Sequence, residues 1–167
     1  MHPWIVAKPM NRPELLQQII AQLTRDQEVF SSAAKAAHEA SIHSENIPDN
    51  RYDTLALEAS YVAQGQANRA QELRQSIETY KQLALASDGN VIRMTSLVTI
   101  TAEDGAEKVV FIGAAEGGLK ITDCRTEITV ITPASPLGRE LLGKSLGDTV
   151  EIEAGTSRIE YEIVAIG

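Results

Sequence analysis

The chain has 167 residues, of which 43% are hydrophobic and only 4% are aromatic, and its formal net charge at pH 7 is -8. That length suits one large domain or two small ones. An acidic chain is not expected to bind nucleic acid by itself, because neutralising phosphates requires clustered lysine and arginine. The charge suits a basic protein surface as partner instead.

The single cysteine, Cys124, leaves no disulfide within the chain, which is typical of a reducing cytosol. The sequence has no run of about 20 apolar residues, so we expect no membrane span. Residues 1–8 lack the basic and apolar segments of a signal peptide. We therefore expect a cytoplasmic protein in which residues 1–10 form a flexible N-terminal extension, with Met10 as a candidate natural start.

A first helix is predicted from residue 11. Asn11 can cap it, Pro13 fits its first turn, and Glu14 follows three residues after the cap. The pattern fades at 41–44, and Pro48 ends it because proline disrupts a helix interior. Apolar residues recur at steps of three, four or seven, as a narrow helical seam requires; they are Leu16, Ile19, Leu23, Phe30, Ala34 and Ala37.

A second helix is predicted to begin between residues 49 and 53 and to end before 87–90. Its stripe alternates steps of three and four, with one polar member; it comprises Leu55, Ala59, Val62, Gln66, Ala70, Leu73, Ile77, Tyr80 and Ala84. The short connection predicts an antiparallel coiled-coil hairpin over residues 11–86. Two helices of roughly 30 residues make a rod of about 45 Å.

Beyond residue 90 the pattern becomes strand-like, and strands are predicted over 97–100, 108–112, 118–122, 127–131, 149–154 and 159–164. Ser135 and Pro136 are typical of the cap and first turn of a short helix. Several short strands with one short helix predict a small α+β domain over residues 91–167. The fold class is therefore α+β, with a helical hairpin preceding a small β-sheet domain.

The stretch from Ile131 to Asp148 reads ITPASPLGRELLGKSLGD. It resembles the C-terminal domain of the bacterial GreA/GreB transcript-cleavage factors, in which a Ser-Pro…Leu-(Ile/Leu)-Gly-Lys…Gly-Asp run is a signature. A helical hairpin forms the other half of that family. The resemblance implies an FKBP-like C-terminal domain that docks on RNA polymerase at the rim of the secondary channel, with Ser135, Pro136 and Lys144 as candidate docking residues.

The hairpin tip carries the candidate chemistry. In the Gre family an acidic pair at the tip, in a pattern close to Asp-Leu-x-Glu-Asn-Ala-Glu-Tyr, helps the polymerase bind its second metal ion. Carboxylates suit Mg²⁺, which is usually held by one or two of them together with water and substrate. The resemblance therefore implies that Glu45 and Asp49 assist the Mg²⁺ of the polymerase, while the chain carries no cofactor of its own.

Two alignments of the tip remain open. If Glu45 and Asn46 match the Glu-Asn of the family, Ile42 takes the place of the first acid. If Asp49 and Asn50 match it instead, Glu45 serves as a nearby first acid. Independently of any resemblance, Asp49 can cap the second helix through its carboxylate.

The function expected is that of a transcription elongation regulator, which binds RNA polymerase, inserts its tip into the secondary channel and stimulates cleavage of backtracked RNA by the polymerase. It would not be an enzyme by itself, and it would meet the transcript 3′ end only within the polymerase. We expect a monomer with no independent nucleic-acid or membrane binding. Three alternatives stay open: a non-cleaving regulator that occupies the channel and competes with other factors there, a prolyl isomerase, and a scaffold whose hairpin self-associates.

Overall fold

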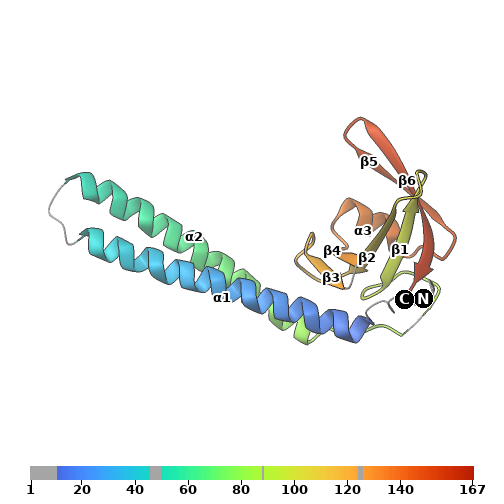
Figure 1. Cartoon of the computed structure of the whole chain (residues 1–167), viewed down its shortest axis with the longest axis horizontal. Coiled ribbons are helices and arrows are strands. Elements are labelled where there is room, and N and C mark those ends of the chain that lie inside the picture. Colours follow the sequence, from blue (N-terminus) through green and yellow to red (C-terminus); the bar gives the residue numbers. More distant parts are fainter. Residues whose placement is uncertain (1–10, 46–49, 88, 124–125) are drawn as a thin grey trace, which may run out of the picture. The chain divides into compact units, whose positions relative to one another are not determined.

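The structure, a computed structural model, describes residues 11–45, 50–87, 89–123 and 126–167, without the side chains of residues 44, 45 and 50–53 (Figure 1). The chain divides into two compact units, Met1–Ile19 with Gln82–Gly167, and Ile20–Lys81. The α+β class is confirmed, because two long helices precede a single mixed sheet. The predicted limits at 1–10, 11–86 and 91–167 stay predictions, and Cys124 lies outside the described residues.

The two predicted helices are present as α1 (Arg12–Glu45) and α2 (Asn50–Lys81). They lie side by side as a hairpin in Figure 1. The predicted cap is confirmed: the side-chain oxygen Oδ1 of Asn11 accepts a hydrogen bond of 2.9 Å from the backbone N–H of Glu14. This bond satisfies one of the donors that the first turn of a helix leaves without a partner.

The seam of the hairpin differs from the prediction by one residue at several points. Leu15 rather than Leu16 is fully buried, and on α2 the buried position is Ala56 rather than Leu55, which is 52% exposed. The shift has a physical reason, since small residues on the seam let two helices approach closely while bulky leucines would hold them apart. From Ala70 to Tyr80 the predicted stripe is correct, because Ala70, Leu73, Ile77 and Tyr80 are all buried. The predicted last member, Ala84, is wrong: α2 ends at Lys81, so Ala84 lies beyond the helix and is exposed.

A polar contact crosses the distal part of the hairpin. The Ser41 side chain is only 3% exposed, and its hydroxyl oxygen lies 2.8 Å from that of Ser60. The Ser41 hydroxyl also donates to the backbone carbonyl of Ala56 at 3.3 Å. These bonds link the two helices at a place where the seam residues are too small to interlock.

The second part of the chain forms one six-stranded sheet with the strand order β3-β4-β2-β1-β6-β5. The strands are β1 (Leu97–Ala102), β2 (Glu107–Ile112), β3 (Lys120–Asp123), β4 (Thr126–Ile131), β5 (Thr149–Ala154) and β6 (Ser157–Ile166). The β2–β4 pair is parallel, and the other pairs are antiparallel. All six predicted strands are thereby confirmed, and the FKBP-like label stays a prediction.

The short helix α3 (Pro136–Leu141) packs over part of this sheet. The buried cluster joins Leu141 of α3 to side chains of β1, β2, β5 and β6; among them are Val98, Ile100, Val110, Ile112, Val150 and Ile163. Their alternation with exposed residues along the strands follows from the two-residue period of a pleated strand. This cluster fixes α3 against the sheet and so determines which side chains α3 presents outward.

Thr95 joins three segments of the first unit. Its hydroxyl accepts the backbone N–H of Ala86 at 2.8 Å, and its carbonyl accepts an N–H of the Arg12 guanidinium at 3.3 Å. Its own N–H donates to the carbonyl of Ile112 at 2.9 Å. Thr95 has a φ of 70°, which is rare for a β-branched residue, so these bonds hold a strained backbone in place.

No helix in the described part of the chain is long and apolar enough to cross a membrane.

Candidate docking site

The candidate site is built around the first turn of α3. The Ser135 hydroxyl accepts the backbone N–H of Gly138 at 3.0 Å and donates to the carbonyl of Thr132 at 2.8 Å. Pro136 occupies the first helical turn, as predicted. Because the Ser135 hydroxyl is used for capping in this structure, its contribution to the site is to hold α3 in position.

The first turn of α3 requires a glycine at position 138. A Cβ atom added at Gly138 would meet the carbonyl oxygen of Thr132, which is rigid backbone, at 2.0 Å. The helix can therefore approach the preceding loop this closely only with glycine at this position. The close approach therefore fixes the first turn of α3 against the loop that contains Thr132.

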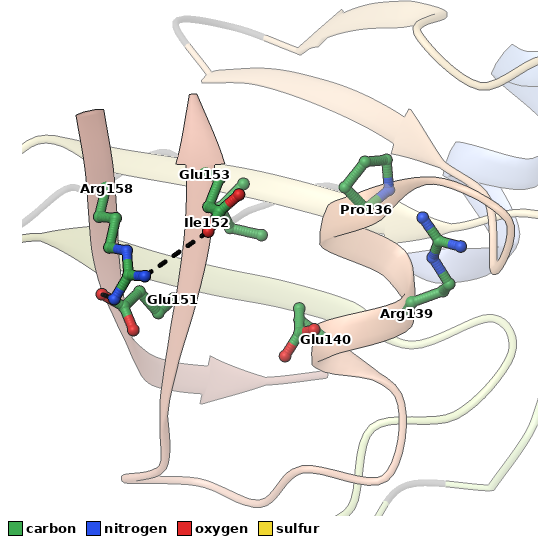
Figure 2. Close-up of a pocket in the computed structure, with 7 residues that line it drawn as sticks. All are labelled: Pro136, Arg139, Glu140, Glu151, Ile152, Glu153 and Arg158. Atoms are coloured by element: carbon green, nitrogen blue, oxygen red, sulfur yellow. Dashed lines mark ion pairs between the residues drawn. The ribbon is translucent and has the colours of Figure 1, made fainter. Parts of the chain in front are cut away.

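A cavity of about 560 Å³ lies between α3 and the β5–β6 hairpin (Figure 2). Its lining residues come from three elements: Pro136, Arg139 and Glu140 from α3, Glu151, Ile152 and Glu153 from β5, and Arg158 from β6. In Figure 2 the α3 side chains stand on one side of the cavity and the β5–β6 side chains on the other. The cavity thus resembles an open groove with polar walls more than a pocket closed around a small apolar ligand.

The charges of the groove are mixed and sum to one negative charge, from three carboxylates and two guanidinium groups. Arg158 lies 3.7 Å from Glu151 and 3.7 Å from Glu153, measured between the charged atoms. These three side chains are between 57% and 77% exposed, so their ion pairs contribute little to stability. Such weak pairs exchange readily for contacts with a partner.

The structure brings only one of the three predicted docking residues to the groove. Pro136 lines it, whereas the Ser135 hydroxyl is directed into the helix cap. Lys144 is half-buried, and its carbonyl accepts the N–H of Ile92 at 2.8 Å. Ser135 and Lys144 therefore do not line the groove that contains Pro136.

The charged wall of the groove was missed by the sequence reasoning. Arg139 follows Pro136 by three residues, and that helical spacing places both on one face of α3. Glu151 and Glu153 alternate with buried positions on β5, so their shared outward face was readable from the sequence. What the sequence did not indicate is that α3 packs next to β5 rather than next to another strand.

The predicted tip residues lie outside the description. Asp49 and the side chain of Glu45 are not among the described residues. Ile42, the residue that takes the place of the first family acid in one alignment, is described and is 47% exposed on α1. Within the described ranges, no group of three or more His, Cys, Asp or Glu side chains is arranged to hold a metal ion.

Comparison with known proteins gives a consistent result. A family model described as "Transcription elongation factor, GreA/GreB, C-term" matches residues 86–167. The transcription elongation factor GreA of Rhodospirillum rubrum is 26% identical over 157 residues, which cover 92% of this chain and 94% of the relative. GreA of Brucella canis is 28% identical over 132 residues, covering 79% of each protein.

Two solved structures also match this chain. GreA factor homolog 1 of Thermus thermophilus matches over 91% of this chain and 94% of its own, with 20% identity and a TM-score of 0.38. The GreA/GreB factor of Nitrosomonas europaea covers 78% of this chain and 90% of its own, with 18% identity and a TM-score of 0.37. The functional conclusion therefore rests on the family match and the sequence relatives, and not on these two structures.

Proposed function

Because the chain belongs to the GreA/GreB family of transcription elongation factors, we propose that it binds RNA polymerase and regulates elongation through the secondary channel. The sheet domain with α3 serves as the docking part, and the tip of the hairpin acts at the polymerase active centre. The chemistry is that of the polymerase, and this chain assists it without being an enzyme.

The observation that carries this proposal is the extent of the sequence match. The family model covers 86–167, which includes α3 and the groove. The relative from Rhodospirillum rubrum extends the likeness to 92% of the chain, and therefore into the hairpin. The net charge of -8 supports a basic protein surface as the partner rather than nucleic acid bound directly.

Within the docking part, the three predicted residues take different proposed roles. Pro136 contacts the polymerase, because it is exposed at the rim of the groove. Ser135 acts indirectly by capping the helix that presents Pro136 and Arg139. Lys144, which does not line the groove, contributes a separate positive charge that a polymerase carboxylate can meet.

At the tip, Glu45 and Asp49 are proposed to help the polymerase hold Mg²⁺ while it cleaves backtracked RNA. Two-metal phosphoryl transfer uses the second ion to position and activate an attacking water. The ion belongs to the polymerase, and a carboxylate supplied from the hairpin would complete its ligand shell. Direct contact with the RNA would then be limited to the transcript 3′ end.

The test is RNA cleavage by backtracked polymerase from the organism that encodes this chain, with and without the protein, at fixed Mg²⁺. We expect faster cleavage that is lost in Glu45→Ala or Asp49→Ala while polymerase binding is kept. Glu39→Ala is the matched control, since Glu39 is an exposed acid on the same helix. Failure of the unmodified protein to bind polymerase at all contradicts the proposal.

A second candidate function is a regulator that occupies the channel without stimulating cleavage. Ile42 favours it, because in one alignment an exposed apolar side chain stands where the family has its first acid. The same assay separates the two functions: this alternative predicts no stimulation, together with competition against a factor that does stimulate cleavage.

The remaining alternatives have less support. A prolyl isomerase needs an apolar, aromatic pocket, whereas Phe111 is fully buried and Tyr161 is 5% exposed, with the Lys108 ammonium 5.5 Å above its ring. Self-association of the hairpin stays a prediction, which a light-scattering concentration series tests directly.

A further inference from the structure

We infer that the free edge of β5 captures an extended segment of RNA polymerase that carries lysine or arginine, and that this segment adds to the sheet as a further strand. The inference rests on the proposed function and names the chemistry of the partner at the docking part. It follows from three features of the groove: an open strand edge, room beside it, and an excess of carboxylates.

The open edge follows from the position and register of β5. This strand is the last in the order of the sheet, so only β6 pairs with it. The two strands are joined by the two-residue turn Gly155–Thr156, and Ala154 faces Ser157 at its base. Gly155 has a φ of 64°, as the first central residue of a type II′ turn requires.

The turn determines which backbone groups are available. In an antiparallel hairpin of this kind the closing pair is hydrogen-bonded, and every second pair after it is bonded in turn. Ile152 and Val150 therefore bond to β6, facing Ile159 and Tyr161. The N–H and C=O groups of the intervening residues point away from β6; these residues are Thr149, Glu151 and Glu153. In the described part of the chain they bond to no other backbone group.

The groove provides room for a strand along this edge. Glu151, Ile152 and Glu153 line the 560 Å³ cavity from β5, and Pro136 and Arg139 line it from α3 (Figure 2). A neighbouring strand lies about 4.8 Å away in a sheet, so an added segment would run between β5 and α3. Addition of a strand to an open edge is an established mode of peptide recognition, in which backbone hydrogen bonds supply affinity and side chains supply specificity.

The charges select a basic segment over a second copy of this chain. Glu151 stands directly opposite Glu160 on β6, and Arg158 is shared between Glu151 and Glu153. If two copies paired through β5, Glu151 and Glu153 of one would face the same carboxylates of the other, which is unfavourable. Lysine or arginine on an added strand would instead meet these carboxylates and Glu140.

The experiment measures amide hydrogen exchange in the full chain, alone and bound to RNA polymerase. In the free protein we expect the amides of Thr149, Glu151 and Glu153 to exchange quickly, and those of Val150 and Ile152 slowly. In the complex we expect the first three to become protected. If they continue to exchange quickly in a saturated complex, the inference is overturned.

A proline variant tests the backbone bond separately from the charge. Proline is tolerated on an edge strand where its missing N–H would face outward. Glu151→Pro should therefore keep the β5–β6 pairing. It should nevertheless weaken polymerase binding roughly tenfold more than Glu151→Ala does, because a tenfold loss of affinity is expected when one or two hydrogen bonds are removed. Equal affinities of the two variants would overturn the inference, and Glu160→Ala controls for charge loss on the neighbouring strand.

The outcomes distinguish a failure of the proposed function from a failure of the inference about the β5 edge. If the unmodified chain does not bind polymerase, the proposed function fails. If it binds, but the β5 amides stay unprotected and Glu151→Pro equals Glu151→Ala, only the inference about the edge fails. Protection of the same amides in the isolated protein at high concentration, with a dimeric mass in light scattering, would assign the edge to a second copy and also overturn it.

Discussion

The hydroxyl oxygens of Ser41 and Ser60 lie 2.8 Å apart and connect α1 to α2 within the distal seam of the hairpin. The contact is almost solvent-free at Ser41, which is 3% exposed. A buried polar pair is satisfied in only one relative position of the two helices, so it specifies their register in a seam of small residues. The pair therefore makes a particular alignment of the helices favourable.

Replacing Ser41 should weaken the hairpin. Ser41→Ala removes the bonds to Ser60 and to the carbonyl of Ala56, and we expect a loss of about 1 kcal/mol in the free energy of unfolding. A double-mutant cycle with Ser60→Ala, followed by denaturant unfolding and circular dichroism, should give a coupling energy of roughly 0.5 kcal/mol or more. Thr24→Ala is the control, since the exposed Thr24 hydroxyl bonds only within α1, to the carbonyl of Ile20. Additive effects would contradict a role for the pair.

Gly138 should not tolerate a side chain. Gly138→Ala places a Cβ atom against the carbonyl of Thr132, so we expect a destabilisation of about 1–3 kcal/mol from overpacking. Gly65→Ala is the matched control, because no heavy atom lies within 4 Å of a Cβ at that position. Within α2 that change should stabilise by about 0.5–1 kcal/mol. Thermal unfolding of both variants checks the opposite signs, and a neutral Gly138→Ala would contradict the close approach.

The cap of α3 can be tested by separating its two hydrogen bonds. Ser135→Ala loses both the bond from the Gly138 N–H and the bond to the Thr132 carbonyl, and we expect a cost of about 1 kcal/mol. Ser135→Asp keeps an acceptor for the N–H but cannot donate when ionised, so its stability should lie between Ser135→Ala and the unmodified chain. Unfolding in urea measures both. Equal stability of all three proteins would show that the cap is energetically unimportant.

At Thr95 the hydroxyl should matter more than the rest of the side chain. Thr95→Ser keeps the acceptor for the Ala86 N–H and should be nearly neutral. Thr95→Val keeps the shape and the strained φ but removes the acceptor, so a loss of about 1–3 kcal/mol is expected from the unsatisfied N–H. Chemical denaturation of the two variants provides the comparison. Indistinguishable stabilities would contradict the role assigned to this hydroxyl.

The strand and helix content of the chain was predictable because each element carries its own local signal. Asn11 as a cap, Ser135 with Pro136, and the alternation along β5 and β6 each depend on neighbours within a few residues. The seam register was predicted wrongly at Leu16, Leu55 and Val62. The helical pattern there offers two adjacent apolar choices, and only the separation of the packed helices decides between them.

The groove was harder to predict than the fold. Its place in a family-like run points to Pro136, whereas in the sequence Arg139 and Arg158 look like ordinary surface charges. Their importance arises from tertiary structure. Although α3 directly precedes β5 in the chain, only the folded domain shows that α3 packs beside β5 and that the two elements enclose the groove. Local patterns do not carry that information.

The buried alanines of the seam determine how wide the helical hairpin is. The distance between the axes of two packed helices ranges over about 8–10 Å according to the side chains at their contact. With Ala56, Ala63 and Ala70 buried there, we expect the distal part of the hairpin to lie at the narrow end of that range, whereas Leu15, Leu23 and Leu73 fill the seam nearer its other end. A hairpin that is thin at its distal end can enter a channel too narrow for a hairpin packed with leucine along its whole length. The buried alanines therefore determine how narrow a channel the hairpin can enter.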